Sequence, residues 1–139
     1  MPSANFTIDD TSPLIQYAGI WRAGNDTGDP LGHLRVALVA VPLVWTYTTF
    51  TFNGTQVYVY GAKRDNHGPY SITLDGTTVT FDGFSSTALW TTLFVSDALT
   101  EGLHTVTVTN QMRKSTNAYL DIDYASSRIC PLLPIILKP

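Results

Sequence analysis

Short segments of alternating apolar and polar residues, separated by turn-forming residues, constrain the fold of this chain most. From Thr46 onward these segments recur about every ten to fourteen residues. Successive side chains of a β-strand point to opposite sides, so this period of two predicts strands with one buried face. The predicted strands are 46–52, 56–60, 70–74, 77–81, 89–95, 102–109 and 118–124. Together they predict an all-β fold, an antiparallel β-sandwich in a single domain over residues 1–139.

Two turn signals and the threonine content support this interpretation. Asn53 and Gly54 follow the first predicted strand, and Asp75 and Gly76 follow the third; both dipeptides are typical of two-residue hairpin turns. Twenty of the 139 residues are threonine, which favours pleated strands over helices. The apolar stretch 34–44 fits either a strand or a short helix, and its periodicity does not decide between them.

Charge and cysteine content exclude several classes of protein. Eight Lys and Arg stand against eleven Asp and Glu, giving a formal net charge of -3, so a nucleic-acid partner is not expected. The apolar runs 36–45 and 129–137 are interrupted by proline and are shorter than the roughly 20 apolar residues of a membrane span. Cys130 is the single cysteine, which excludes an intramolecular disulfide framework.

Three sequons for N-linked glycosylation, at Asn5, Asn25 and Asn53, predict a secreted glycoprotein or the extracellular face of a membrane protein. The first residues lack the charged start and apolar core of a signal peptide. Either the chain is cytosolic or the segment is a mature domain behind a new methionine, and we favour the second interpretation.

Several motifs occur in an order that resembles one known group of proteins. They lie at 9–17, 19–21, 51–64, 70–76, 102–106 and 120–124. Together they resemble the extracellular jelly-roll domains of uncharacterised fungal cell-surface proteins, which are similar in turn to galactose-binding-like sandwiches, many of them carbohydrate-binding modules. The resemblance covers residues 5–30 and 46–124, while 31–45 and 125–139 depart from it through their apolar content. Whether those two segments belong to the native domain stays open, and exposed apolar segments make self-association an expectation.

The resemblance implies a glycan or cell-wall polysaccharide as partner. Sugar binding needs aromatic faces for the C–H side of a pyranose and planar polar groups for its hydroxyls. The loop 61–69 supplies the polar groups, beside three aromatic residues. The candidate carbohydrate-binding residues are Tyr60, Arg64, Asn66, His67, Tyr70 and Trp90. The alternative is a solvated loop held by an Arg–Asp contact, with no ligand.

Structural calcium is a second expectation, because sandwiches of this type often hold an ion where the first and last strands meet. The candidate ligands are Asp9, Asp10, Asp121 and Asp123, which supply the hard oxygen atoms that Ca²⁺ prefers. The alternative is a set of solvated carboxylates on turns and edge strands. No other cofactor is expected.

The predicted function is therefore a non-catalytic glycan-recognition or adhesion domain at a fungal cell surface or wall. A structural or protein-interaction ectodomain without sugar binding is the alternative. A glycoside-active enzyme has least support. Asp121 and Asp123 share one predicted strand face, whereas a glycosidase pair normally comes from different elements across a cleft. The three histidines also lack the spacing of a metal site.

Overall fold

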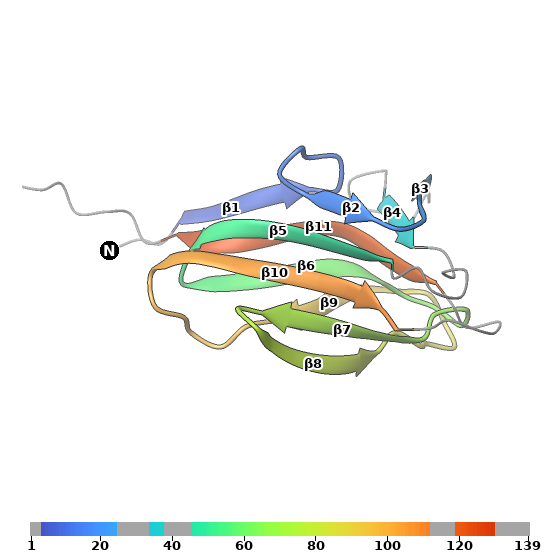
Figure 1. Cartoon of the computed structure of the whole chain (residues 1–139). Helices are drawn as coiled ribbons and strands as arrows, with labels where there is room; N and C mark the ends of the chain where they lie inside the picture. The colour runs from blue at the N-terminus through green and yellow to red at the C-terminus, as the bar shows by residue number, and fades with distance from the viewer. Residues whose placement is uncertain (1–3, 25–33, 38–45, 112–118, 130–139) are drawn as a thin grey trace, which may run out of the picture.

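The protein is a sandwich of two antiparallel β-sheets (Figure 1). The computed structural model describes residues 4–24, 34–37, 46–111 and 119–129. Within these ranges all regular structure is β-strand, and no helix has the length and apolar character needed to cross a membrane. The prediction of an all-β antiparallel sandwich is confirmed.

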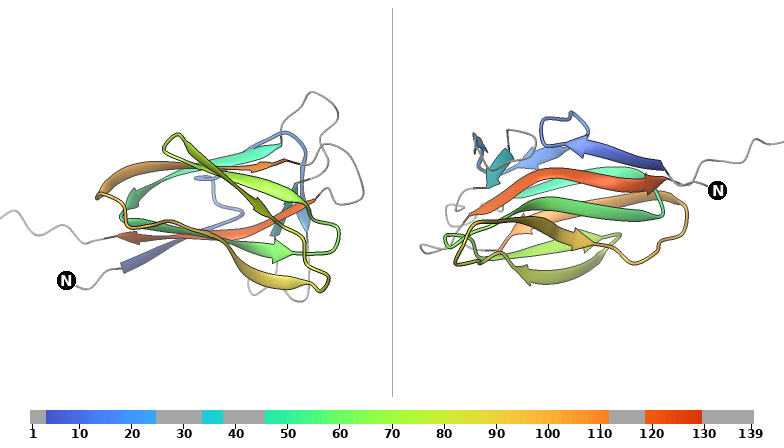
Figure 2. Two further views of the ribbon diagram at one scale, coloured as in Figure 1. Left: turned by 90° about the horizontal axis from the view of Figure 1, so that it is seen from below. Right: turned by 180° about the vertical axis from the view of Figure 1, so that it is seen from behind.

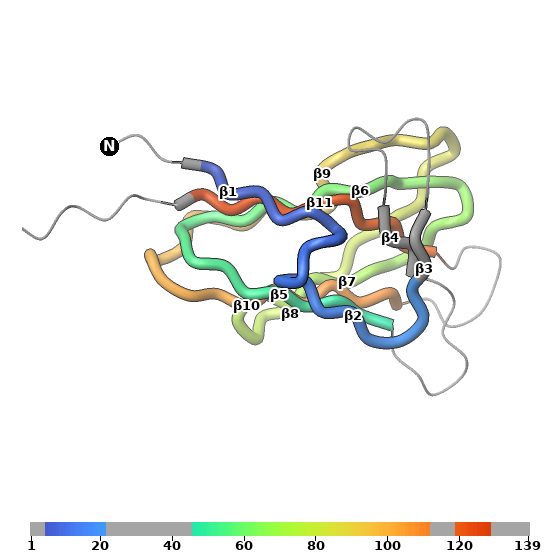
Figure 3. The backbone as a smooth tube through the Cα atoms, turned by 90° about the horizontal axis from the view of Figure 1, so that it is seen from above, coloured from blue at the N-terminus to red at the C-terminus, as the bar shows by residue number. Residues whose placement is uncertain are grey.

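Six strands form one sheet and five form the other, and Figure 2 (left) shows the two layers edge on. The six-stranded sheet has the order β3 (Trp21–Gly24), β4 (Leu34–Ala37), β11 (Leu120–Ile129), β6 (Gln56–Lys63), β9 (Leu89–Val95). β1 (Ala4–Asp9) pairs with the second half of β11, and the two strands lie side by side in Figure 3. The five-stranded sheet has the order β2 (Gln16–Ala18), β5 (Tyr47–Gly54), β10 (Gly102–Asn110), β7 (Pro69–Leu74), β8 (Thr77–Asp82).

The core lies between the sheets, where the apolar faces of the alternating strands meet. The strictly alternating burial of β5 places Phe50 and Phe52 inside, and β6 places Val57 and Val59 inside from the other sheet. The remaining buried members of this cluster are Ile8, Ile15, Tyr70, Ile72, Leu93, Val106, Val108, Leu120, Ile122 and Ala125. The inward positions predicted for Val106, Val108, Leu120 and Ile122 are confirmed.

The hairpin predicted at Asn53 and Gly54 is wrong. β5 and β6 belong to different sheets, so the chain crosses from one layer to the other between them. A hairpin would place Phe50 and Val57 in the same sheet, whereas here they enter the core from opposite sheets. A sandwich requires the apolar faces of two sheets to be buried against each other. This requirement outweighs the turn preference of Asn53 and Gly54, so the chain changes sheets here instead of forming a hairpin.

The hairpin predicted at Asp75 and Gly76 is confirmed. Leu74 and Thr77 close the pairing of β7 with β8. Asp75 has a φ of 49° and Gly76 a φ of 87°. Two consecutive positive φ values are the requirement of a type I′ turn, which Asp-Gly accommodates readily.

Two predicted boundaries differ from the structure. β11 runs to Ile129, beyond the predicted end at Tyr124, because it pairs with β1 on one side and β6 on the other. Of the ambiguous stretch 34–44, residues 34–37 form a strand, β4. Residues 38–44 lie outside the described residues, as do Asn25 and Cys130.

Candidate functional site

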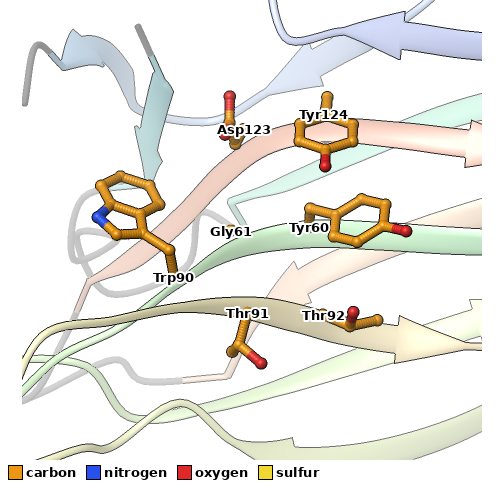
Figure 4. Close-up of a pocket in the computed structure, with 7 residues that line it drawn as sticks. All are labelled: Tyr60, Gly61, Trp90, Thr91, Thr92, Asp123 and Tyr124. Carbon is orange, nitrogen blue, oxygen red and sulfur yellow. The ribbon is translucent and has the colours of Figure 1, made fainter. Parts of the chain in front are cut away.

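An open groove lies on the outer face of the six-stranded sheet, over β6, β9 and β11 (Figure 4). Its volume is about 330 Å³. The residues that line it are Tyr60, Gly61, Trp90, Thr91, Thr92, Asp123 and Tyr124. Figure 4 shows Trp90 at one end, the rings of Tyr60 and Tyr124 at the other, and Asp123 between them along β11. Of the described residues that line the groove, none carries a positive charge.

Strand alternation and register bring the tyrosines to this face. Val59 points into the core, so its neighbour Tyr60 points outward. Tyr60 pairs with Thr92 on β9 and with Tyr124 on β11, which places all three on one face. The rings of Tyr60 and Tyr124 stack with their centroids 4.3 Å apart, and Tyr58 stacks on Tyr60 at 6.2 Å.

The pKa values of the Tyr60 and Tyr124 hydroxyls are raised in this stack. Partial burial raises the pKa of Tyr60, and Tyr58 raises it further. Burial likewise raises the pKa of Tyr124, with smaller contributions from Tyr60 and the charge of Asp123. At neutral pH both phenols are therefore protonated hydrogen-bond donors at the rim of the groove.

Tyr124 is a site residue that the sequence pattern missed. With Leu120 and Ile122 inward, simple alternation assigns Tyr124 to the core as well. In the structure Ile122 pairs with Gly61 and Tyr124 pairs with Tyr60, so Asp123 is an extra residue in β11. This bulge turns Tyr124 outward, and the sequence carries no local signal for it.

The loop after β6 is held by Asp121. The Arg64 Nε atom lies 2.8 Å from one carboxylate oxygen of Asp121, and the His67 Nε2 atom lies 3.1 Å from the other. The Arg64 guanidinium carbon lies 5.2 Å from the centre of the Trp90 ring, within cation–π range. The Arg–Asp contact of the alternative interpretation is thus present, and it also places Arg64 at the Trp90 end of the groove.

Three of the six predicted carbohydrate-binding residues, Tyr60, Arg64 and Trp90, come together at the groove. Asn66 is exposed in the adjoining loop, and its Oδ1 atom lies 2.7 Å from His67 Nδ1.

The rings of His67 and Tyr70, two further predicted carbohydrate-binding residues, lie away from the surface in this structure. Both side chains are buried, with 2% and 1% of their surface exposed. Tyr70 lies on the core face of the opposite sheet, stacks on Phe81 and donates a 2.6 Å hydrogen bond to the Leu93 carbonyl. The Tyr70 ring is covered by the packing of the two sheets, so it has no exposed aromatic face for a sugar.

Three of the four predicted metal-ligating residues also come together. Oxygen atoms of Asp9, Asp10 and Asp123 all lie within 4.8 Å of one another, where the end of β1 meets β11. Two of these side chains are buried, and hard carboxylate oxygens are the atoms that Ca²⁺ takes. Asp121 is not in this group, because its carboxylate accepts a hydrogen bond from Arg64 instead.

Of the predicted glycosylation sites, Asn5 and Asn53 are exposed in strands, so their side chains are accessible. Glycosylation at these residues stays a prediction.

No protein-family model and no curated protein sequence matches the chain. Solved structures do match. A family two carbohydrate esterase from Cellvibrio japonicus superposes with a TM-score of 0.63 at 14% identity, over 96% of this chain and 38% of the esterase. The chain therefore spans little more than a third of that enzyme.

Two carbohydrate-binding modules match over nearly their whole length. The family 35 module from Clostridium thermocellum gives a TM-score of 0.59 at 11% identity, over 90% of this chain and 98% of the module. The CBM36-1 domain of a multidomain xylanase from the hindgut metagenome of Trinervitermes trinervoides gives 0.55 at 16% identity, over 94% and 100%. At these identities the likeness concerns the fold. The chain thus has the jelly-roll β-sandwich fold that these carbohydrate-binding modules share.

Proposed function

We propose that the protein is a non-catalytic glycan-recognition domain and that the groove over β6, β9 and β11 is its binding site. The observation that carries the proposal is the grouping of Tyr60, Trp90 and Tyr124 around one open groove on an outer sheet face. Large aromatic side chains normally bury their rings in the core. Three of them around a solvent-facing groove, in a fold shared with carbohydrate-binding modules, fit a ligand with apolar C–H faces.

Polar groups in the groove complement the hydroxyls of a sugar. Thr91 and Thr92 carry hydroxyls that both donate and accept. The guanidinium of Arg64, held by Asp121, supplies further donors beside Trp90. The groove volume lies at the lower end of the range of about 300 to 1,000 Å³ for small-molecule sites, which suits a short stretch of a glycan chain.

Among the residues that the structure describes, the two carboxylates nearest the groove, Asp121 and Asp123, do not form an acid–base pair. One carboxylate oxygen of Asp121 accepts a hydrogen bond from Arg64 Nε, and the other lies 3.1 Å from His67 Nε2. Asp123 neighbours Asp9 and Asp10 rather than an acid across the groove. Hydrolysis of a glycosidic bond needs two carboxyl groups flanking that bond, so this arrangement supports binding without turnover.

We assign the domain to an extracellular setting, as a secreted protein or an adhesion domain at a fungal cell surface or wall, with a cell-wall polysaccharide as the partner. This assignment is supported by the resemblance of the sequence motifs and by the accessible sequons at Asn5 and Asn53.

A glycan array on monodisperse protein tests the proposal. We expect saturable retention on a subset of glycans, lost in Trp90→Ala and in Tyr60→Ala. Tyr47→Ala is the matched control, because Tyr47 is an exposed aromatic on β5 of the other sheet and should bind as wild type. Melting curves show that each variant is folded. A folded wild-type protein that retains no glycan, or a Trp90→Ala variant that binds unchanged, contradicts the proposal.

An exposed apolar patch favours one alternative, a protein-interaction domain. Phe6, Leu14 and Leu103 are 45%, 54% and 73% exposed and line a common hollow formed by β1, β5 and the ends of neighbouring strands. Exposed apolar surface promotes association. This alternative predicts a mass that rises with concentration in light scattering, and a lower mass for Leu103→Ser. A constant monomer mass contradicts it.

A further inference from the structure

The tyrosine stack at one end of the groove brings two phenol rings into close contact across neighbouring strands. Tyr60 on β6 pairs with Tyr124 on β11, and both side chains lie on the outer face of the six-stranded sheet (Figure 4). Their ring centroids are 4.3 Å apart and their planes are inclined by 22°. Aromatic pairs usually keep their centroids about 4.5 to 7 Å apart, so these two rings are closer than usual.

The two rings can also be reached from solution. Tyr60 and Tyr124 are both partly exposed, and both line the open groove. The third ring of the stack belongs to Tyr58, and it is less well placed. Its centroid lies 6.2 Å from that of Tyr60, and its hydroxyl donates a 2.9 Å hydrogen bond to Gln56 Oε1. The pairing of β6 with β11 therefore holds one particular pair of accessible phenols in contact.

This arrangement suits the coupling of two tyrosines by oxidation. A phenol that loses an electron and a proton becomes a phenoxyl radical, and part of its unpaired electron lies on the ring carbons ortho to the oxygen. Two such radicals join at these carbons when their rings meet. Reaction is fast where the reacting groups are already held in contact, as the rings of Tyr60 and Tyr124 are.

We propose that Tyr60 and Tyr124 form an oxidative cross-linking site, at which a peroxidase with hydrogen peroxide joins β6 to β11 through a dityrosine bond. Each phenol gives up one electron and one proton, and one H₂O₂ takes up both electrons and both protons to form two water molecules. The two radicals then form one carbon–carbon bond between their ortho positions. The hydrogens on those two carbons move to the oxygens as protons, which restores both aromatic rings and both hydroxyls.

The bond would join residues far apart in the sequence, beside the bulge at Asp123. A covalent link of this kind restricts the unfolded chain, as a disulfide does. We therefore expect the cross-linked protein to melt at a higher temperature than the untreated protein. The inference does not depend on glycan binding.

Treatment of the dilute 139-residue chain with a haem peroxidase and equimolar hydrogen peroxide tests the inference. We expect a monomer that has lost the mass of two hydrogen atoms and shows dityrosine fluorescence. Trypsin cleaves after Lys63 and Lys114, so Tyr60 and Tyr124 fall on separate peptides. Tandem mass spectrometry should find these two peptides joined through the two tyrosines. Free tyrosine in a parallel reaction shows that the oxidant is active.

Tyr60→Phe and Tyr124→Phe should each abolish the link, because phenylalanine keeps the ring contact but has no hydroxyl to oxidise. Tyr47→Phe is the matched control. Tyr47 is exposed on β5 of the other sheet, and its cross-strand neighbours are Ala18 and Thr109, so this variant should form the link as the wild type does.

The outcomes separate this inference from the proposed function. A treated wild-type chain without a Tyr60–Tyr124 bond overturns the inference, whether the chain is unchanged, joined only to other copies, linked through Tyr58 or oxidised at Trp90. A link that survives in Tyr60→Phe overturns it as well. The glycan array uses untreated protein, so failure of the cross-link leaves the glycan-binding function standing. A chain that retains no glycan yet forms the link overturns only the glycan-binding function.

Discussion

Tyr70 illustrates how hydrogen bonding decides the role of a single residue. Its ring is buried and its hydroxyl donates to the Leu93 carbonyl across the core, which joins β7 of one sheet to β9 of the other. Burial, followed by the nearby charge of Asp82, raises the pKa of Tyr70 to about 12, so the hydroxyl remains a donor at neutral pH. The role of this residue is therefore to stabilise the sandwich.

Tyr70→Phe tests this role. We expect the free energy of unfolding to fall by about 1–2 kcal/mol, because the buried Leu93 carbonyl loses its donor. Urea denaturation measures the loss. Glycan retention on the array should be unchanged, since the residue lies away from the groove. If Tyr70→Phe reduces glycan retention while the free energy of unfolding is unchanged, Tyr70 has a role in binding and the stabilising role is contradicted.

His104 connects three segments of the five-stranded sheet and its loops. Its Nδ1 atom lies 2.5 Å from the Asp75 carboxylate in the β7–β8 turn, and its Nε2 atom lies 2.7 Å from the Thr100 carbonyl. Both partners are acceptors, so the doubly protonated ring satisfies both contacts. The hydrogen bond to Asp75 raises the pKa of His104 above 6.5. The backbone amide of Thr105, followed by His104, lowers the pKa of Asp75 below 3.8.

These opposite shifts predict how stability depends on pH. The stabilisation by His104 is complete below pH 6.5 and is lost as the pH rises through its raised pKa. The stabilisation by Asp75 is complete above pH 3.8 and is lost as the pH falls through its lowered pKa. Urea denaturation across pH 3 to 9 should therefore show the largest excess of wild type over His104→Gln between about pH 4 and 6.5. An excess that is constant with pH would contradict the charged pair.

At the scale of secondary-structure elements, the close approach of β6 and β11 shapes the groove. Gly61 lies where the two strands pair beside the β11 bulge. A Cβ atom at this position would collide with the backbone oxygen of Asp121 and lie 2.8 Å from Leu93 Cδ1. Only glycine lets the strands approach this closely, and the approach brings Asp123 and Tyr124 beside Tyr60.

Gly61→Ala should force these strands apart. We expect a loss of about 1–3 kcal/mol in the free energy of unfolding, the usual cost of overpacking, together with a change in Trp90 fluorescence. Gly76→Ala is the comparison. No atom lies within 4 Å of a Cβ there, but a φ of 87° strains alanine, so stability should fall without any change at the groove. Wild-type stability of Gly61→Ala would contradict the role given to this glycine.

At the scale of the whole molecule, the meeting of the first and last strands bears on stability. Asp9 and Asp10 at the end of β1 come within 4.8 Å of Asp123 on β11, and the Asp10 amide donates to the Asp123 carbonyl at 3.0 Å. Several carboxylate oxygens gathered in one place are the hard ligands that Ca²⁺ takes. Structural calcium therefore stays a prediction that a melting experiment resolves.

We expect calcium to raise the melting temperature of the chain relative to protein in chelator, because a ligand that binds only the folded state stabilises it. The gain is about 2.7 kcal/mol at a calcium concentration 100 times the Kd. Asp10→Asn should remove the response. Asp97→Asn is the control and should retain it, because Asp97 is an exposed carboxylate after β9 that lies outside this group. If the wild-type protein has the same melting temperature in calcium and in chelator, the prediction of a structural calcium site is contradicted.

Much of the fold follows from local sequence alone. The alternation in 46–52 and 102–109 determined which residues of β5 and β10 face the core, because a strand has a period of two whatever its partner. Asp75 and Gly76 determined the β7–β8 hairpin, because their backbone preference matches the turn. Tyr60, Arg64 and Trp90 were identified as candidate site residues from their chemistry beside one loop, and the structure groups them at one groove.

Only the tertiary structure decided which strands pair and which side chains a ligand can reach. Packing of the two apolar faces sends β5 and β6 to different sheets despite Asn53 and Gly54. The same packing buries Tyr70, and the bulge at Asp123 exposes Tyr124. Alternation is a property of one strand, whereas register, bulges and sheet membership depend on contacts between residues far apart in the sequence. The full set of groove residues depends on those distant contacts, and for that reason the local pattern identified Tyr60 and Trp90 but not Tyr124.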